Sequence, residues 1–407
     1  TGTVQSHTLG IRGGSDKINY NFNYVHFDEQ AIMIGSSFKR NNLSLNLKSK
    51  LNEKVQLAFT IRYSDTEIRG GGANEQREFS STDARFRHSV GYSPIPIPGL
   101  LDDDTDENVA GYLVNPFVAV ADNDRLQDRR NYNMLGGLTW KIIDGLQFKS
   151  DFGFDNFRNL DYRFYGNSTF YINNIPAAEN QGSPALIFTN RENNRFRTAN
   201  TLDYDFKKHL GENHRLKVLV GQETIINKEN LLTNVIHGFP EFFNFNNAIN
   251  LTTEGVPQSV NNFNNPNDEL LSFFGRVNYD IKDRYLLTAT YRADGSSRFL
   301  GDNRWGYFPS VAAGWKVSEE SFLKNVSWLD LLKLRVSYGE AGNNNIITGQ
   351  TIQNYLSFNS TWINGVESFW AASNVLANPD LRWETTVTQN LGLDYELFKG
   401  RVSGSFE

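Results

Sequence analysis

The chain has 407 residues, a formal net charge of −6, no cysteine and 13% aromatic residues. The lack of cysteine excludes disulfide bonds and thiolate metal sites, and the acidic balance argues against nucleic acid as a partner, because phosphate binding needs a basic patch. No stretch approaches the ~18 consecutive apolar residues of a transmembrane helix, but the negative mean hydropathy does not exclude membrane strands, in which only every second residue is apolar.

The two ends of the chain predict a piece of a longer protein. It begins TGTVQSHTLG, without a methionine or a targeting segment, and it ends at RVSGSFE in the middle of an alternating pattern. A strand cut there would leave an unpaired edge, which native sheets avoid. We therefore expect further sequence on both sides.

The dominant pattern is an alternation of apolar and polar residues, which is typical of half-buried β-strands. It is clear at 43–47, where three leucines alternate with Ser44 and Asn46, and at 55–63, where Val, Leu, Phe, Ile and Tyr occupy the odd positions. The polar segment 51–54 between them predicts a tight turn, so we expect a hairpin.

The same hairpin unit recurs along the chain. Further alternating runs flank short turns predicted at 143–145, 211–213, 280–283 and 399–400. The pattern predicts an all-β protein with about 14 antiparallel strands, most of them near the ~9–11 residues that a tilted strand needs to cross a bilayer. Long connections rich in Asn and Gly are expected at 67–130, 159–193, 229–268 and 341–382. Tight turns at one end and long loops at the other are typical of outer-membrane barrels, whose long loops face outward.

The two faces of the strands indicate which side meets lipid. One set of alternate positions holds Leu, Val, Phe and Tyr, and the other holds Lys, Asp, Arg and Asn. In a barrel the apolar set faces hydrocarbon, where a Lys or Arg costs ~2–4 kcal/mol at mid-bilayer, and the polar set lines a wet lumen. Aromatic residues are placed near the ends of the predicted strands. Either they form girdles at the two membrane interfaces, or they reflect the high strand propensity of Tyr and Phe. These residues are Tyr63, Phe154, Tyr279, Tyr285, Tyr291 and Tyr338.

Soluble β-architectures are the alternatives. A propeller or a solenoid would show a fixed period, but the tight turns are unevenly spaced. A β-sandwich needs neither strands of this length nor loops of this size. One short interruption at 318–323 has capping-box character and predicts a helical turn.

No segment predicts an enzyme or a cofactor site. The six histidines are scattered, and His209 and His214 match no familiar metal motif, so solvated turn positions are expected for all six. The acidic segment 102–107 spaces carboxylates as a calcium loop does, but Glu107 replaces the central glycine and Leu113 replaces the closing glutamate. A solvated loop is favoured there, and a loop-bound divalent cation stays open.

A more specific signal lies at 271–323. The stretches FFGRVNYDIKDRYLLTATYRADGSSRF and NRWGYFPSVAAGWKVSEESFL resemble the most recognisable motifs in the barrel of SusC/RagA-type TonB-linked (TonB-dependent) transporters. LKLRVSYGEAGNNNI and NPDLRWETTVTQNLGLDYELFKGRVSGS continue the match in order. GGSDKINYNFNYVHFDEQAIMIGSSFKR is similar to an early barrel hairpin of that family. The resemblance covers nearly the whole chain, more weakly through the long loops.

The residues of these motifs have structural interpretations. The segment 294–297 (DGSS) predicts a turn, with a glycine available for positive φ. Glycine and proline inside the next strand predict its entry and a kink or bulge, at Gly306, Pro309 and Gly314. Tryptophans in the motifs are expected in the wall or a girdle rather than at a ligand, and they are Trp305, Trp315 and Trp383.

The resemblance implies the organisation of the complete protein. Residues 1–407 are expected to be part of one TonB-dependent receptor β-barrel domain, a transmembrane antiparallel barrel of ~22 strands, with the plug, the TonB box and the C-terminal strands absent. In that family TonB acts on the plug through the TonB box, and a SusD-like surface lipoprotein forms a lid over the barrel. An assembly of two barrels with two lids is usual, and the implied location is the outer membrane, in contact with its lipid.

The expected function is the barrel wall of an importer that takes up oligosaccharides or peptides together with a SusD-like lipoprotein. A siderophore or cobalamin receptor, without such a lipoprotein, is the nearest alternative, and a surface adhesin or structural β-protein is one from another class. Aromatic loop residues are candidate solute contacts, because sugar faces stack on rings and apolar pockets hold peptide side chains. Alternatively, the same aromatic residues pack the loops together or contact the lid protein. The candidates are Phe242, Phe243, Trp362, Phe369 and Trp370.

Overall fold

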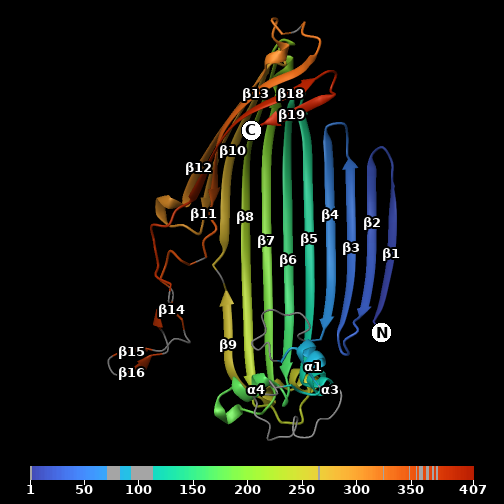
Figure 1. The fold of residues 1–407 in the computed structure, drawn as a ribbon, viewed down its shortest axis with the longest axis vertical. Helices are drawn as coiled ribbons and strands as arrows, with labels where there is room; N and C mark the ends of the chain where they lie inside the picture. Colours follow the sequence, from blue (N-terminus) through green and yellow to red (C-terminus); the bar gives the residue numbers. More distant parts are fainter. Residues whose placement is uncertain are drawn as a thin grey trace.

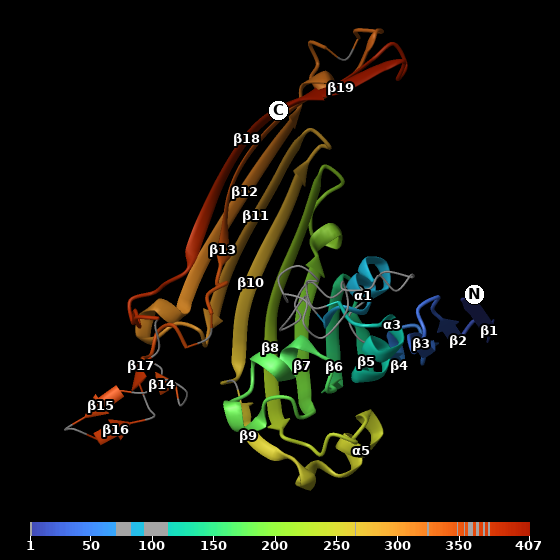
Figure 2. The same ribbon diagram turned by 60° about the horizontal axis from the view of Figure 1, so that its bottom comes forward.

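The computed structural model describes residues 2–70, 83–92, 113–264, 266–323, 325–347, 349–353, 355–356, 361–363, 366–368, 371–372 and 375–407. Over these residues one 15-stranded sheet curves around a hollow without closing on itself (Figures 1 and 2). Its strands follow one another in sequence order, and only β9 lies off this path, paired with β8. The predicted all-β meander is confirmed, with one strand more than the pattern indicated.

The strands of the sheet are β1 (Thr3–Gly14), β2 (Ile18–Gln30), β3 (Ser37–Lys50), β4 (Val55–Arg69), β5 (Asn123–Ile143), β6 (Leu146–Tyr165), β7 (Ala185–Asp205), β8 (His214–His237), β9 (Val256–Asn264), β10 (Asp268–Ile281), β11 (Tyr285–Ser296), β12 (Trp305–Lys316), β13 (Leu329–Asn343), β18 (Glu384–Leu397) and β19 (Val402–Phe406). Two short ribbons pair β14 (Tyr355–Leu356) with β17 (Ala371–Ala372), and β15 (Thr361–Ile363) with β16 (Val366–Ser368).

Short helices occupy the connections. They are α1 (Arg85–Gly91), α3 (Pro116–Asp122), α4 (Phe170–Asn174) and α5 (Phe245–Asn250), with 3-10 turns η2 (Ala178–Asn180), η3 (Phe206–Lys208), η4 (Thr252–Glu254), η5 (Gly301–Arg304) and η6 (Val317–Glu319). Within the described residues, no helix is both long and apolar enough to cross a membrane.

All the predicted tight turns lie at one end of the sheet, the upper end in Figure 1. Three of them depend on left-handed backbone: Gly145 has φ 82°, Lys282 and Asp283 have φ 54° and 55°, and Lys399 and Gly400 have φ 59° and 75°. Two consecutive residues with positive φ form a type I′ turn, whose twist matches that of the flanking strands. The helices α1, α3 and α4 lie at the opposite end with the longer connections.

An apolar band of constant height follows from the register. In β4 the band runs from Val55 to Tyr63, and in β5 it runs back from Tyr132 to Trp140. Because Val55 pairs with Trp140 and Tyr63 pairs with Tyr132, its two edges are level on neighbouring strands. Beyond the Tyr63–Tyr132 pair, away from the tight turns, the same face becomes polar, beginning with Asp65. The band is as tall as the ~9–11 residues that cross a bilayer.

The strands themselves are longer than predicted. β5 has 21 residues and β8 has 24, because the ladder continues past the apolar band into segments without regular alternation, such as 123–131 and 229–237. Large parts of the loops predicted at 159–193 and 229–268 are therefore paired strand. The prediction was wrong there because alternation disappears once neither face meets lipid, although backbone hydrogen bonds still pair the strands.

Glycines in the motif strands were predicted to form a turn and a kink, but in the structure they allow aromatic rings to pack closely against the strands. Gly295 lies inside β11, and a Cβ there would lie 3.1 Å from the ring of Trp305. A Cβ on Gly306 would lie 2.4 Å from the Phe308 ring. The β11–β12 register has no irregularity at Gly306, Pro309 or Gly314. The glycines leave room for aromatic rings to lie across the strands, as aromatic side chains do over strand glycines.

Aromatic residues lie at the band edges as the girdle interpretation expects. At the tight-turn end, Tyr285 stacks near Trp315, and both donate hydrogen bonds to Glu320, at 2.5 and 3.1 Å. Glu320 follows η6, the helical turn predicted at 318–323, although its N-cap Lys316 makes no side-chain cap bond. Such rings keep an apolar body against the band and a polar tip in water.

Candidate functional site

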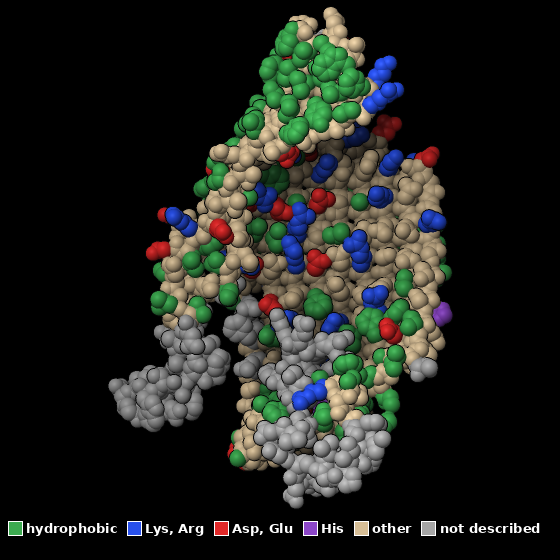
Figure 3. Space-filling model, viewed as in Figure 1, with side chains coloured by type: hydrophobic (Ala, Val, Ile, Leu, Met, Phe, Trp, Pro, Cys, Tyr) green, Lys and Arg blue, Asp and Glu red, His purple; other side chains and the backbone are tan. Residues whose placement is uncertain are grey.

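The hollow side of the sheet is the polar side. Figure 3 looks into it and shows Lys, Arg, Asp and Glu side chains gathered across the wall. The register accounts for this, because the positions that alternate with the apolar band all face the other way. Their side chains are the surface that a solute inside the hollow would meet.

A charged network lies in the middle of this wall. Glu223 on β8 is largely buried and accepts hydrogen bonds from Arg197 at 2.7 Å and Arg292 at 3.0 Å. Arg292 also donates to Asp294 at 2.7 Å and to Ser272 at 2.9 Å. Four strands contribute to this network, so it holds the wall together across β7, β8, β10 and β11. Its donors and acceptors are mutually satisfied, which indicates a structural role.

A second arginine fastens a loop to the wall. Arg298 makes a two-bond ion pair with Asp268, at 2.9 and 3.0 Å. The same guanidinium donates to the carbonyl oxygens of Asn344 and Ile346, at 3.2 and 3.0 Å. The start of the β13–β18 connection is therefore held against the mouth of the hollow by a fork of fixed geometry.

The long connections pack together into what we name the loop cap, residues 83–92, 113–122, 166–184 and 238–255. Arg85 of α1 is 1% exposed and donates to the carbonyl oxygens of Asn123 and Val120, at 2.8 and 2.9 Å. Asp83 accepts from the backbone N–H groups of Phe170 and Tyr171, at 2.6 and 2.9 Å. Buried charges thus join segments that are far apart in sequence. Figure 2 shows α1 and α3 beside the ends of the strands.

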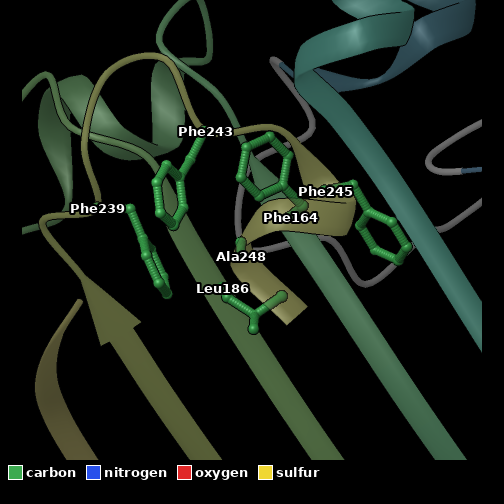
Figure 4. Close-up of a cluster of buried hydrophobic side chains, with 6 residues drawn as sticks. All are labelled: Phe164, Leu186, Phe239, Phe243, Phe245 and Ala248. Atoms are coloured by element: carbon green, nitrogen blue, oxygen red, sulfur yellow. The ribbon is translucent and has the colours of Figure 1, made fainter. Parts of the chain in front are cut away.

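An aromatic core supports the loop cap (Figure 4). The rings of Phe239 and Phe243 stack at 5.8 Å, and Phe164 meets Phe245 edge to face at 6.5 Å. Burial of each such ring contributes about 1.5–3 kcal/mol. The complete cluster is Phe164, Leu186, Phe239, Phe243, Phe245 and Ala248.

A second buried cluster contains ionisable groups. Tyr171 stacks on Tyr165 at 4.2 Å, and its hydroxyl lies 3.2 Å from Nε2 of His237. Burial, with a smaller effect of Tyr165, raises the pKa of Tyr171 to about 12. Burial likewise lowers the pKa of His237. Both groups are therefore neutral at physiological pH.

Two histidines differ from the predicted solvated positions. His88 is 3% exposed and His237 is 5% exposed. Nδ1 of His88 accepts a hydrogen bond from the N–H of Val114 at 3.1 Å, and burial together with Arg87 lowers the pKa of His88. Loop packing, which a single sequence does not reveal, buries both rings. Among the described residues, no three His, Asp or Glu side chains are grouped to hold a metal.

A polar cavity of about 380 Å³ opens on the hollow face of β2 to β6. We name it the amide cradle. Its side chains are Asn23, Asn42, Ser44, Arg62, Ser64, Asn131, Asn133 and Asp155. They form two adjoining cross-strand rows, because Ser44 pairs with Arg62 and Arg62 with Asn133, while Ser64 pairs with Asn131. The sequence prediction missed this site, although its signal was present in the polar residues that alternate with the leucines and aromatics of the band.

The predicted solute contacts lie in different surroundings. Phe243 is 9% exposed within the loop-cap core, while its neighbour Phe242 is 81% exposed and contacts Phe243 edge to face at 5.3 Å. Trp362 is in β15, opposite Glu367. Phe369 and Trp370 lie outside the described residues, as does the acidic segment 102–107. Among the candidates whose side chains the structure describes, Phe242 and Phe243 lie together.

Comparison with known proteins agrees with this architecture. Residues 74–407 match a family model described as TonB dependent receptor-like, beta-barrel. The TonB-dependent receptor P39 of Formosa agariphila is 30% identical over 416 residues, and the TonB-dependent receptor SusC of Bacteroides thetaiotaomicron is 28% identical over 450 residues. Each alignment includes 100% of this chain, which spans 37% and 41% of the two relatives.

Solved structures share the fold. The RagAB peptide transporter superposes with a TM-score of 0.75 and 22% identity, over 99% of this chain and 43% of that chain. The ferripyoverdine receptor of the outer membrane of Pseudomonas aeruginosa superposes with a TM-score of 0.55 and 13% identity, over 99% and 46%. With the family model matched over most of its length, the chain belongs to the TonB-dependent receptor-like β-barrel family of the outer membrane.

Proposed function

We propose that this chain forms the wall of a TonB-dependent importer of oligosaccharides or peptides. The observation that supports this function most directly is the division of the sheet into an apolar band of membrane height and a polar hollow face, with the loop cap at one end. A barrel built this way has a lipid-facing outside and a wet inside. The chain spans well under half of its relatives, so the activity belongs to the complete protein.

The proposed partners follow from the relatives. TonB appears in the names of P39 and SusC, and the RagAB structure is described as a peptide transporter. We propose that TonB supplies the energy for uptake, and that a SusD-like surface lipoprotein covers the mouth near the loop cap. Residues 1–407 would then be one part of a larger barrel domain, completed by a plug, a TonB box and further strands.

The alternatives have weaker support. A siderophore receptor shares the fold, but the ferripyoverdine receptor superposes less well than RagAB, with TM-scores of 0.55 against 0.75. An adhesin or structural protein has no need of a polar hollow face with a cavity of about 380 Å³. We also propose that the chain is not an enzyme, in keeping with a family of receptors and transporters.

Exposed aromatic rings of the loops are the proposed solute contacts. Phe242 best fits this role, because its ring is 81% exposed and rests on a buried partner, Phe243. A ring held from one side presents its other face to a sugar ring or an apolar side chain. Trp362, Phe369 and Trp370 are proposed as contacts in the β13–β18 connection.

The test is uptake by the source cells. Deletion of the gene for the complete protein should abolish energy-dependent accumulation of labelled oligosaccharides or peptides, and deletion of tonB should have the same effect. Restoring the gene provides the control. Uptake that persists without TonB, or accumulation of an iron chelate instead of either solute class, would contradict the proposal.

A further inference from the structure

We infer that the amide cradle is a subsite for an acidic saccharide, a hydroxyl-rich ring that carries a carboxylate or sulfate. The inference rests on the proposed import function and chooses between its two solute classes. A volume of about 380 Å³ lies within the ~300–1,000 Å³ of small-molecule sites. The cradle is thus large enough for a sugar ring.

The lining chemistry favours a saccharide over a peptide. Nine of the ten residues that line the cavity carry amide, hydroxyl, carboxylate or guanidinium groups, and the exception is Leu43. Amides both donate and accept hydrogen bonds, which suits neighbouring hydroxyls that do the same. Peptide side chains bind mainly in apolar pockets, and Leu43 and Tyr63 reach this cavity only from positions that alternate with its polar rows.

One side-chain atom of the cradle residues has no hydrogen-bond partner among the described residues. Asn133 donates to Asp155, while Oδ1 of Asn133 is buried and accepts no hydrogen bond from any described residue. Buried polar atoms are normally paired. This oxygen has almost no accessible surface, so a solute in the cradle would meet the exposed groups beside it, such as Asn131 and Arg62.

The charge of the row favours an anion. Arg62 is exposed in the cradle and, among the described residues, has no carboxylate within ion-pair distance. The same cross-strand row continues through Asp155 to Arg195 on β7, which is also exposed and unpaired within the described part of the chain. Arg195 lines the neighbouring cavity, so within the cradle one guanidinium accompanies one carboxylate, which already accepts from Asn133. A guanidinium binds carboxylate or sulfate oxygens with two parallel hydrogen bonds.

The position of the cradle suits capture from outside. Tyr63 lies between Arg62 and Ser64, and it pairs with Tyr132 at the edge of the apolar band that lies away from the tight turns. The cradle is therefore level with the membrane boundary on the loop-cap side. A solute that enters from the long-loop end reaches this wall before it reaches the tight-turn end.

The experiment uses the complete purified transporter with its lipoprotein, in detergent, on an array of acidic and neutral oligosaccharides. We expect wild type to bind acidic glycans and Arg62→Gln to weaken that binding at least about tenfold, as the loss of a charge-assisted hydrogen bond does. Neutral glycans should be little affected. Arg276→Gln is the matched control, because Arg276 is also exposed on the hollow face but lies in a separate cavity near the tight turns.

Each contrary outcome has a distinct meaning. Equal binding of acidic glycans by wild type and Arg62→Gln, or an equal loss in Arg276→Gln, would overturn the subsite. So would a lower melting temperature of Arg62→Gln with unchanged glycan binding, which would assign the cradle to another segment of the same protein. TonB-dependent peptide uptake without glycan binding would overturn the saccharide and keep the importer. Loss of TonB-dependent uptake altogether would overturn the proposed function itself.

Discussion

At the scale of single residues, glycines and aromatic rings interlock across the strands. The ring of Phe308 occupies the space above both Gly306 and Gly342, where a Cβ would come within 2.4 and 2.0 Å of it. Phe308 is itself buried and packs against Trp383 at 5.3 Å. Sequence reasoning assigned Gly306 to a strand entry and a kink or bulge and did not single out Gly342, because one sequence does not show which ring lies over which strand.

Replacing such a glycine should destabilise the wall. Gly342→Ala forces Phe308 from its position, and overpacking of this kind costs about 1–3 kcal/mol. We expect a lower urea midpoint for the complete barrel, followed by gel mobility. Gly136→Ala is the control, since a Cβ there meets only Phe152, at 4.0 Å, and an equal loss in both variants would refute the account.

The charged network makes a second prediction at this scale. Arg292→Ala removes one of two cations from Glu223 and leaves Asp294 and Ser272 without their donor. Breaking a largely buried pair costs up to about 3–5 kcal/mol, and the partial exposure of Arg292 places the expected loss at the lower end. Arg276→Ala, whose side chain bonds only Asn278 among the described residues, should change stability by less than about 0.5 kcal/mol. Equal urea midpoints for wild type and Arg292→Ala would contradict a structural network.

At the scale of elements, the loop cap is the part that sequence reasoning described least well. Its boundaries were wrong because strand pairing continues through segments without regular alternation. Its core depends on contacts between Phe164, Phe239 and Phe245, which are distant in sequence. Alternation along one strand predicts neighbours at fixed spacing, but it does not predict which loops meet. The tight turns, by contrast, were predicted correctly because local sequence determines them.

Substitutions of the neighbouring residues Phe242 and Phe243 test solute binding and loop-cap packing separately. Phe243→Ala removes a buried ring, which costs about 3–5 kcal/mol, and should make the segment around α5 sensitive to protease. Phe242→Ala removes an exposed ring and should leave protease resistance unchanged while weakening solute binding. Limited proteolysis and solute affinity measured on the same samples decide this. Identical proteolysis of the two variants would contradict the packing described for Phe243.

Acid should loosen the loop cap. Burial lowers the pKa values of His88 and His237, so the folded cap binds fewer protons than the unfolded one. Its stability is therefore fully present above the ordinary histidine pKa of ~6.5 and is lost as pH falls from there toward the lowered pKa values. Protonation would also break the bond from Val114 to Nδ1 of His88.

Protease resistance of the cap should consequently fall between about pH 7.5 and pH 5.5, on either side of the ordinary histidine pKa. The double variant His88→Asn, His237→Gln keeps an acceptor at each position without a titrating ring, and it should retain its resistance at the lower pH. If wild type and the double variant lose resistance together, these histidines do not cause the change.

At the scale of the whole molecule, alternation and turn positions were sufficient to predict a membrane barrel wall. The period of two determines which residues share a face, and the register then aligns those residues into one band. Site chemistry was less predictable. The amide cradle combines residues of five strands, β2 to β6. In the sequence each of them is an ordinary polar strand residue, and only the register shows that they are neighbours.

The most direct test of the membrane wall is fractionation of the source cells with an antibody against this chain, comparing boiled and unboiled samples. We predict a band in the outer membrane that is much heavier than 46.3 kDa and that changes mobility on boiling, as a closed barrel does when it unfolds. A water-soluble species near 46.3 kDa without a heat shift would contradict the account.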